Sequence, residues 1–323
     1  MIGCVGIGGY ATNYIRAALQ FQEEGLARFR AAVERYPERV PDKVKLLEAN
    51  SVPIYPDMTA MYADHPEIEV TAIGTGLPLH YPMAKQALEQ GTHVFMAKPS
   101  CPVIQHVDDI SRVRRNRAKV LAVDFQHIHS VGAQTIKKHI ASGDLGLIKR
   151  VVARMIWCRN EKYYQRNSWA GKYRTGDTYI LDGPMNNPHA HYINDALYFA
   201  SQHPVGFASP TAVQAELYRA HRIEGEDTAC IRAWTDTGSE ILVYSTLCGE
   251  DQATETHIDI SGSRGRAYWS WQGDKIETDT VTVEETTEKA KSITAFRQML
   301  DCVRTGARPL VTIEDTRNHV LFT

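Results

Sequence analysis

The sequence lacks the features that would place the protein in a membrane, on nucleic acid or in an oxidising compartment. No apolar run approaches the length of a membrane span, and no basic region precedes the apolar amino terminus as in a signal peptide. The 36 lysines and arginines are balanced by 38 acids and form no run that would hold nucleic acid. The six cysteines show no Cys-x-x-Cys spacing. We therefore expect a cytoplasmic protein without a disulfide framework or a zinc site.

The length of 323 residues is sufficient for two domains, and the pattern changes along the chain. In the first part, β-rich runs at 2–5, 29–33, 69–74, 92–96 and 119–123 alternate with helical segments, for example over 82–90. This alternation predicts βαβ units and a parallel sheet. Later strands, predicted at 151–157, 212–218, 228–234, 240–246, 256–260, 266–271 and 280–283, follow one another across short turns. We predict a Rossmann domain over 1–122 and an α+β domain with an open, mostly antiparallel sheet over 123–323.

A glycine-rich turn follows the first predicted strand. It reads Gly6-Ile7-Gly8-Gly9-Tyr10-Ala11, a G-x-G-x-x-A pattern in front of helical spacing. In a dinucleotide site the first glycine permits the tight turn, the second admits the pyrophosphate, and the alanine keeps the helix close to the strand. The diphosphate then lies at the positive end of the helix. The alternative is an ordinary glycine turn.

An acid ends the second predicted strand, roughly twenty residues after the glycines. Glu34 at this place is expected to bind the adenosine ribose. Because its charge repels a 2′-phosphate, it favours NAD over NADP. The adjacent Arg35 would accept a phosphate or stack on adenine, which leaves NADP as the alternative.

Two more segments follow predicted strands of the first domain. Thr75-Gly76-Leu77-Pro78-Leu79-His80 comes after one strand, and Lys98 comes after another. Ligands bind at the carboxyl ends of strands in an open parallel sheet. Pro99 disfavours a helical conformation at Lys98, so we expect this lysine to end its strand in extended form and to bind a substrate hydroxyl. The alternative is a surface lysine in a loop.

These segments resemble the Gfo/Idh/MocA oxidoreductases, the relatives of glucose–fructose oxidoreductase and inositol dehydrogenase. The resemblance is carried by Gly6 to Ala11, Glu34-Arg35, Thr75 to His80, Gly91-Thr92-His93-Val94, Lys98-Pro99, Gly143-Asp144-Leu145-Gly146 and His191. It implies NAD(P) between a Rossmann domain and a larger open-sheet domain, with a sugar or polyol as substrate. It also implies a homodimer or homotetramer that pairs through the exposed face of the second sheet.

The resemblance also implies roles for individual residues. The cofactor would be bound by Gly6, Ile7, Gly8, Gly9, Tyr10, Ala11, Glu34, Arg35, Thr75, His80 and Lys98. The catalytic set would be Lys98, His191, Asn187 and Asp195. Two positions depart from the family pattern, since Ala97 replaces the usual glutamate before Lys98 and Asn187 replaces the usual aspartate. The lost glutamate is expected to affect the geometry of the nicotinamide end and of the lysine.

The residues around His191 also predict a local structure. Asn187 followed by Pro188 is typical of a helix N-cap with proline in the first helical position. His191 would then lie in the first turn, where the helix dipole disfavours imidazolium and suits a general base. Asp195, one turn further on, would orient the ring. We expect no metal at His189 and His191, because histidines two apart in a helix point to different faces.

The sequence also offers candidate substrate contacts. His127 and His129 alternate along a segment predicted to be extended, and His127 follows Phe125-Gln126, where relatives have a basic residue. Tyr164, Arg166 and Trp169 belong to a loop whose aromatic faces and polar groups suit a carbohydrate. With Lys98, Asn187 and His191 they form the predicted substrate set. The alternative is a loop that packs on its own domain.

Together these observations favour an NAD(P)-dependent dehydrogenase that removes hydride from a ring hydroxyl of a sugar, glycoside or cyclic polyol. Two alternatives use the same residues. One is a redox-assisted glycosidase or lyase that returns the hydride after bond cleavage. The other is a dinucleotide-binding sensor without turnover, which is suggested by Ala97 and Asn187 in place of the two usual acids.

Overall fold

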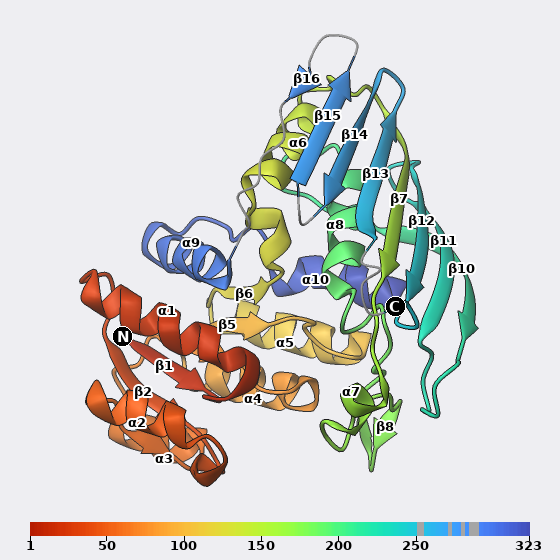
Figure 1. Cartoon of the computed structure of the whole chain (residues 1–323). Helices are drawn as coiled ribbons and strands as arrows, with labels where there is room; N and C mark the ends of the chain where they lie inside the picture. The colour runs from red at the N-terminus through yellow and green to blue at the C-terminus, as the bar shows by residue number, and fades with distance from the viewer. Residues whose placement is uncertain (251–254, 271–272, 279–281, 284–290) are drawn as a thin grey trace. The chain divides into compact units, whose positions relative to one another are not determined.

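The chain forms two compact units in a computed structural model that describes residues 1–250, 255–270, 273–278, 282–283 and 291–323 (Figure 1). Unit 1 comprises Met1–Cys101, Gln105–Asp124 and Ser292–Glu314, and unit 2 comprises Pro102–Ile104, Phe125–Lys291 and Asp315–Thr323. None of the described helices is long and apolar enough to cross a membrane.

Unit 1 is built on a six-stranded parallel sheet in the order β3-β2-β1-β4-β5-β6. Its strands are β1 (Ile2–Val5), β2 (Phe29–Val33), β3 (Ile54–Tyr55), β4 (Val70–Ile73), β5 (His93–Ala97) and β6 (Leu121–Asp124). This is the strand order of a dinucleotide-binding Rossmann sheet, so the predicted fold of the first domain is confirmed. The sequence did not predict β3, because its two half-buried residues carry no detectable periodicity.

Five helices connect these strands, and a sixth arrives from the end of the chain. The connecting helices are α1 (Thr12–Glu23), α2 (Pro41–Ala49), α3 (Met58–Asp64), α4 (His80–Glu89) and α5 (Ile104–Asn116). The later helix α9 (Ser292–Thr305) belongs to unit 1, because Phe296 stacks on Phe95 at 4.5 Å and meets Phe21 edge-on at 5.4 Å. The compact units therefore differ from a single division after residue 122.

Unit 2 contains an eight-stranded sheet in the order β10-β11-β12-β7-β13-β14-β15-β16. Its strands are β7 (Ile148–Ile156), β10 (Pro210–Tyr218), β11 (Thr228–Thr235), β12 (Glu240–Thr246), β13 (Thr256–Gly262), β14 (Gly265–Ser270), β15 (Gly273–Thr278) and β16 (Thr282–Val283). Among the described residues of this sheet, only β7 and β12 pair in parallel, which confirms the predicted mostly antiparallel sheet. Of the predicted strands 266–271 and 280–283, residues 271, 280 and 281 lie outside the described residues.

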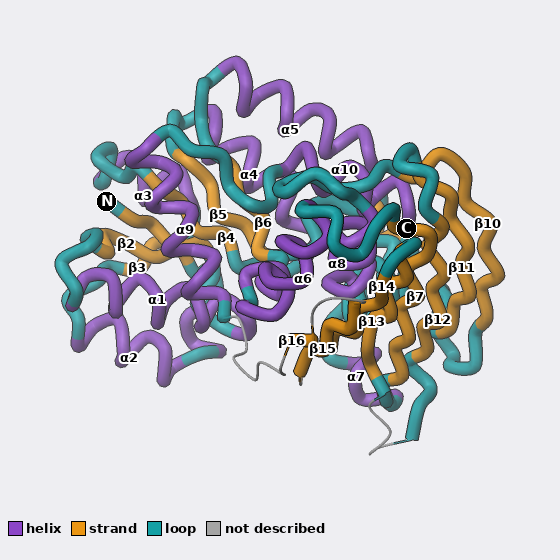
Figure 2. The backbone as a smooth tube through the Cα atoms, turned by 90° about the horizontal axis from the view of Figure 1, so that it is seen from above, coloured by secondary structure: helices purple, strands orange, loops and turns teal. Residues whose placement is uncertain are grey.

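The two faces of this sheet differ in composition. One face carries small and branched apolar side chains such as Ala153, Val243 and Ile258. Helix α8 (Ala190–Ala200), every residue of which is buried, lies against this sheet (Figure 2). The other face exposes aromatic residues, among them Tyr244 and Tyr268. The remaining elements of the unit are α6 (Val131–Ala141), α7 (Glu161–Gln165), the hairpin of β8 (Arg174–Thr175) and β9 (Thr178–Tyr179), and most of α10 (Ile313–Phe322).

A buried lysine of α6 caps the carboxyl end of α8. The Lys137 ammonium donates to the backbone carbonyls of Tyr198 at 2.5 Å, Ser201 at 2.6 Å and Gly206 at 3.1 Å. We expect Lys137→Met to lower the free energy of unfolding by about 3 kcal/mol in urea titrations, because these carbonyls lose their donor away from water. The exposed neighbour Lys138→Met is the control and should change it by less than about 0.5 kcal/mol. Equal effects of the two variants would contradict this role of Lys137.

Candidate functional site

The glycine turn of unit 1 has the geometry that a dinucleotide requires. Gly6 follows β1 with a φ of +85°, a conformation that favours glycine. A Cβ at Gly8 would lie 2.9 Å from a Val40 methyl group, and a Cβ at Gly74 would lie 2.6 Å from the Cα of Ala11. Ala11 ends the short 3₁₀ helix η1 (Gly9–Ala11), from which α1 continues. The turn, the loop after β4 and the helix start are therefore packed closely enough to need small residues.

Glu34 joins the end of β2 to this turn. Its carboxylate accepts a hydrogen bond from the backbone N–H of Tyr36 at 3.0 Å and a longer one from the N–H of Ile7 at 3.4 Å. Arg35 is exposed, and its guanidinium lies 5.6 Å from the ring centre of Tyr36. The acid thus lies beside the glycine turn, at the place where the ribose of a bound dinucleotide is expected.

His80 connects the loop after β4 to the turn after β5. Its Nδ1 lies 2.7 Å from the carbonyl oxygen of Pro99, and its Nε2 lies 3.0 Å from the carbonyl oxygen of Thr75. Burial lowers the pKa of the ring, although the two carbonyls act in the opposite direction. Because both ring nitrogens face backbone carbonyls, His80 positions the turn that carries Lys98. The Lys98–Pro99 peptide bond is cis.

Sequence reasoning missed one acid beside Lys98. Asp124 is the last residue of β6, and the strand register pairs it with Ala97, where the family glutamate is absent. It is fully buried and accepts hydrogen bonds from the hydroxyls of Tyr10 and Tyr14, each at 2.9 Å. Burial raises its pKa to about 6, against the hydrogen bonds of neighbouring hydroxyls and the charge of Lys98. An acid at the end of a buried strand was the only signal in the sequence.

The raised pKa of Asp124 predicts a pH dependence of stability. Between pH 4 and 6 the folded protein keeps a proton that the unfolded chain releases, so this contribution to stability is full below pH 4 and lost as the pH rises through 6. The change from 3.8 to about 6 corresponds to about 3 kcal/mol. We expect Asp124→Asn to gain about that much stability relative to the natural protein between pH 4 and 7. Urea titrations across this range test it.

The exposed Asp42→Asn is the matched control for this measurement, because its side chain lies in solvent in the same unit. Its stability should follow that of the natural protein at every pH. If Asp124→Asn also follows the natural protein between pH 4 and 7, then Asp124 is ionised in the folded state throughout and the assignment is wrong.

In unit 2, His191 lies in the first turn of α8, as predicted, but the helix begins differently. The N-cap residue is His189, and it makes no side-chain cap. The prediction of an Asn187 cap is wrong, because the Asn187 amide donates to the carboxylate of Asp182 at 2.8 Å. The backbone before the helix forms turns, with the N–H of His189 bonded to the carbonyl of Pro184 at 2.7 Å.

The prediction that Asp195 orients His191 is also wrong. The Asp195 carboxylate lies 2.8 Å from Nδ1 of His127, and burial raises its pKa well above the ordinary value. His127 in turn stacks on His191, with ring centres 4.2 Å apart and planes 20° from parallel. The segment around His127 is a 3₁₀ helix, η4 (Gln126–His129), rather than extended. Asp195 thus contacts the ring of His127, which in turn stacks on His191.

The predicted carbohydrate loop is folded on itself. The Arg166 guanidinium lies 3.6 Å from the ring centre of Tyr163 and donates to the carbonyl of the same residue at 2.6 Å. It also lies 5.3 Å from the ring centre of Trp169. Tyr164 instead lines a cavity of about 500 Å³ together with His221. Of the three predicted contacts in this loop, only Tyr164 faces that cavity.

The strand order, the glycine turn and the acid after β2 together are those of a dinucleotide-binding Rossmann unit. Residues 1–125 match the Gfo/Idh/MocA family, described as "Oxidoreductase family, NAD-binding Rossmann fold". An uncharacterized oxidoreductase of Synechocystis sp. is 26% identical over 105 residues, 32% of this chain and 28% of that protein. The uncharacterized oxidoreductase YdgJ of Escherichia coli is 31% identical over 81 residues, 25% of this chain and 23% of that protein.

Solved structures extend the likeness of the fold to both units. The WlbA dehydrogenase of Bordetella pertussis, in complex with NADH and UDP-GlcNAcA, has a TM-score of 0.82 and 21% identity, covering 99% of this chain and 92% of that one. The aldose-aldose oxidoreductase of Caulobacter crescentus, complexed with glycerol, has a TM-score of 0.78 and 18% identity, covering 99% and 94%. At these identities the likeness shows the fold alone.

Proposed function

We propose that the protein is an NAD-dependent oxidoreductase that removes hydride from a ring hydroxyl of a sugar, glycoside or cyclic polyol. The observation that carries this proposal is the glycine turn within a 3-2-1-4-5-6 sheet, with Glu34 beside it and Lys98 at the end of β5. When bound, the nicotinamide accepts the hydride. Among the solved structures of this fold, one is a dehydrogenase in complex with UDP-GlcNAcA and another is an aldose-aldose oxidoreductase, which supports this substrate class.

The cofactor preference follows from the surroundings of the glycine turn. A Cβ at Gly8 would collide with Val40, so this position suits glycine. A glycine at this place in the turn lets the backbone approach a diphosphate closely. The backbone N–H groups at the start of α1 would hold the diphosphate, and Glu34 would hold the ribose hydroxyls. Since a 2′-phosphate would meet the Glu34 carboxylate, we favour NAD over NADP.

In this proposal Lys98 and His191 have different roles toward the substrate hydroxyl. The ammonium group of Lys98 binds the oxygen and favours the loss of its proton, and the imidazole of His191 takes that proton. The buried Asp124 carboxyl replaces, from the neighbouring strand, the acid that Ala97 lacks, and it steadies the lysine charge.

The stacked pair of His127 and His191 suits a base. Asp195 fixes the His127 ring, and both imidazoles are largely buried, with their ring centres 4.2 Å apart. The stacked His127 ring thus holds the His191 imidazole in one orientation, as a positioned base requires.

The direct test of this function is a spectrophotometric assay. The purified protein is mixed with NAD and a panel of sugars, inositols and glycosides, and the absorbance of the reduced cofactor is followed. Reduction that depends on both substrate and protein supports the proposal. Product release without net reduction supports the redox-assisted cleavage instead, and NAD binding without any reaction supports a sensor.

We further propose that two or four copies of the chain associate through the outer face of the second sheet. Trp234, Tyr244 and Tyr268 expose 38%, 46% and 37% of their surface there, and an exposed aromatic patch of this kind is typical of an interface. We expect Tyr244→Glu to reduce the mass in light scattering to that of one chain. The control Tyr179→Glu, with an exposed tyrosine in the β8–β9 hairpin, should keep the assembled mass. A natural protein that is monomeric contradicts the proposal.

A further inference from the structure

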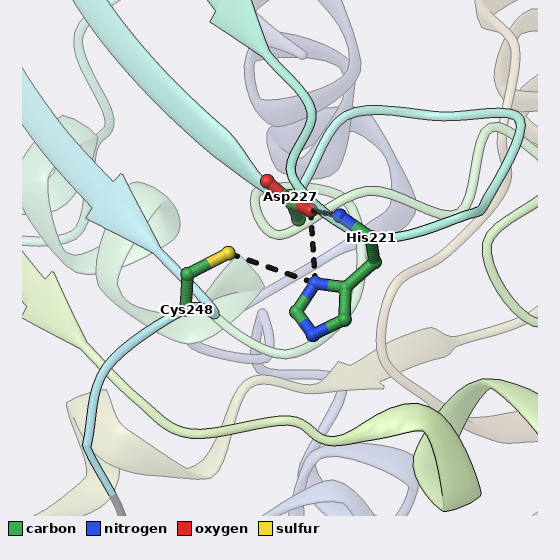
Figure 3. A group of neighbouring side chains, drawn as sticks. All are labelled: His221, Asp227 and Cys248. Atoms are coloured by element: carbon green, nitrogen blue, oxygen red, sulfur yellow. Dashed lines mark hydrogen bonds and ion pairs between the residues drawn. The ribbon is translucent and has the colours of Figure 1, made fainter.

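Three side chains of unit 2 that the proposed function does not use converge beside the ends of two strands (Figure 3). Asp227 immediately precedes β11, Cys248 follows β12, and His221 lies in the connection between β10 and β11. The potential ligand atoms of the three residues all lie within 4.8 Å of one another. The sequence predicted no zinc site, because the six cysteines show no Cys-x-x-Cys spacing.

The Asp227 carboxylate is fixed in place by the connection that it closes. Its Oδ2 accepts hydrogen bonds from the backbone N–H groups of Ala220 at 2.8 Å and His221 at 2.7 Å. The cluster therefore contains a buried, ordered oxygen ligand beside a histidine and a thiol.

The geometry does not fit a nucleophilic cysteine triad. Such a triad needs the thiol on one ring nitrogen and the acid on the other, so that the ring can take a proton from sulfur. Here Nδ1 of His221 is the nitrogen that faces both groups, with Asp227 Oδ2 at 2.9 Å and Cys248 Sγ at 3.6 Å. Figure 3 shows both contacts meeting at this single nitrogen. The thiol and the carboxylate thus contact the same ring nitrogen, which leaves no second nitrogen for the arrangement of a triad.

We propose that His221, Asp227 and Cys248 bind a thiophilic divalent cation, with Zn²⁺ as the best match. Zinc takes sulfur, imidazole nitrogen and carboxylate oxygen, at about 2.3 Å from sulfur and about 2.1 Å from nitrogen. In a tetrahedral site these lengths put sulfur and nitrogen about 3.6 Å apart, which matches the observed 3.6 Å. The oxygen and nitrogen, 2.9 Å apart, must separate by about 0.4 Å to reach their tetrahedral spacing.

Three protein ligands leave one coordination position open, as in zinc sites that bind water or a substrate oxygen. His221 also lines the cavity of about 500 Å³ that Tyr164 lines, and the two rings are 5.0 Å apart. The cation would replace the proton of the Cys248 thiol, so its binding releases that proton to solvent. An ion here joins the connection before β11 to the segment after β12.

The test is metal binding by the full-length protein, freed of metal with a chelator and kept reduced with a phosphine. The reductant matters because Cys158 pairs with Cys248 across an antiparallel bridge and would otherwise be able to oxidise with it. Zn²⁺ affinity is measured by competition with a chromophoric chelator. Co²⁺ is then added as a spectroscopic probe, since a thiolate ligand gives an intense near-ultraviolet absorption band.

We expect one equivalent of Zn²⁺ per chain and a thiolate band with Co²⁺. Cys248→Ser should abolish that band, and Cys248→Ser and His221→Ala should each weaken Zn²⁺ binding at least about tenfold, since even indirect partners of a ligand contribute that much. Cys230→Ser, a half-buried thiol on β11, is the matched control and should bind like the natural protein. Circular dichroism without metal checks that each variant is folded.

Three results would overturn the proposal: no saturable Zn²⁺ binding by the natural protein, unchanged affinity in folded Cys248→Ser, or a Co²⁺ spectrum without the thiolate band. NAD affinity is measured on the same samples. Because the cluster shares no residue with the glycine turn, failure of the metal site leaves the proposed oxidoreductase function untouched.

Discussion

Replacing Lys98 with alanine is expected to lower kcat by at least about a hundredfold, the scale of a positioned acid–base group. The ammonium group stabilises the developing negative charge on the substrate oxygen, and this charge exists mainly in the transition state. The loss should therefore appear in kcat, while the affinity for NAD, measured by calorimetry, changes little. Steady-state rates with the best substrate of the panel provide the measurement.

Lys45→Ala is the matched control, because Lys45 is an exposed lysine of α2 in the same unit. Its rates should equal those of the natural protein. Should Lys98→Ala turn over at the natural rate, the lysine would have no part in the chemistry. A large rise in KM with kcat unchanged would restrict Lys98 to substrate binding.

His191→Asn is expected to lower kcat by about a hundredfold or more, because a general base contributes about 10² to 10⁴ in rate. Asparagine keeps a polar side chain of similar reach but cannot accept the hydroxyl proton as a base. The remaining rate should rise steadily with pH, since hydroxide in solution then takes the proton. Initial rates between pH 6 and 10 would be compared with those of the natural protein.

The exposed His203→Asn serves as the control for this histidine, and its pH profile should be that of the natural protein. A His191→Asn variant that keeps both the rate and the pH profile would show that another group takes the proton. The stacked ring of His127 would then be the first residue to test.

Local patterns predicted the parts of the structure that depend on neighbouring residues. The glycine turn, the acid at the end of β2 and the lysine after β5 are each read within a few residues, and each lies where its pattern placed it. Both sheet types also followed from the order of the elements, because strands alternate with helices in the first part of the chain and follow one another across short turns in the second. His191 lies in the first turn of α8, as predicted. The predicted cap was wrong, because the Asn187 amide donates to Asp182 instead.

Contacts between distant parts of the chain were beyond such patterns. Asp195 meets His127 across 68 positions of sequence, and only the packing of α8 against η4 decides which histidine it reaches. The return of α9 to unit 1 likewise depends on aromatic stacking between Phe296 and Phe95. The cluster of His221, Asp227 and Cys248 is set by the pairing of β11 with β12.

The pairing of Ala97 with Asp124 has a consequence for how such proteins are recognised. In this chain an acid faces Ala97 from the neighbouring strand, so it lies outside the linear Glu-Lys-Pro pattern. A search that demands glutamate before the lysine would discard this chain. A search that also considers residues paired on adjacent strands of the sheet would retain it.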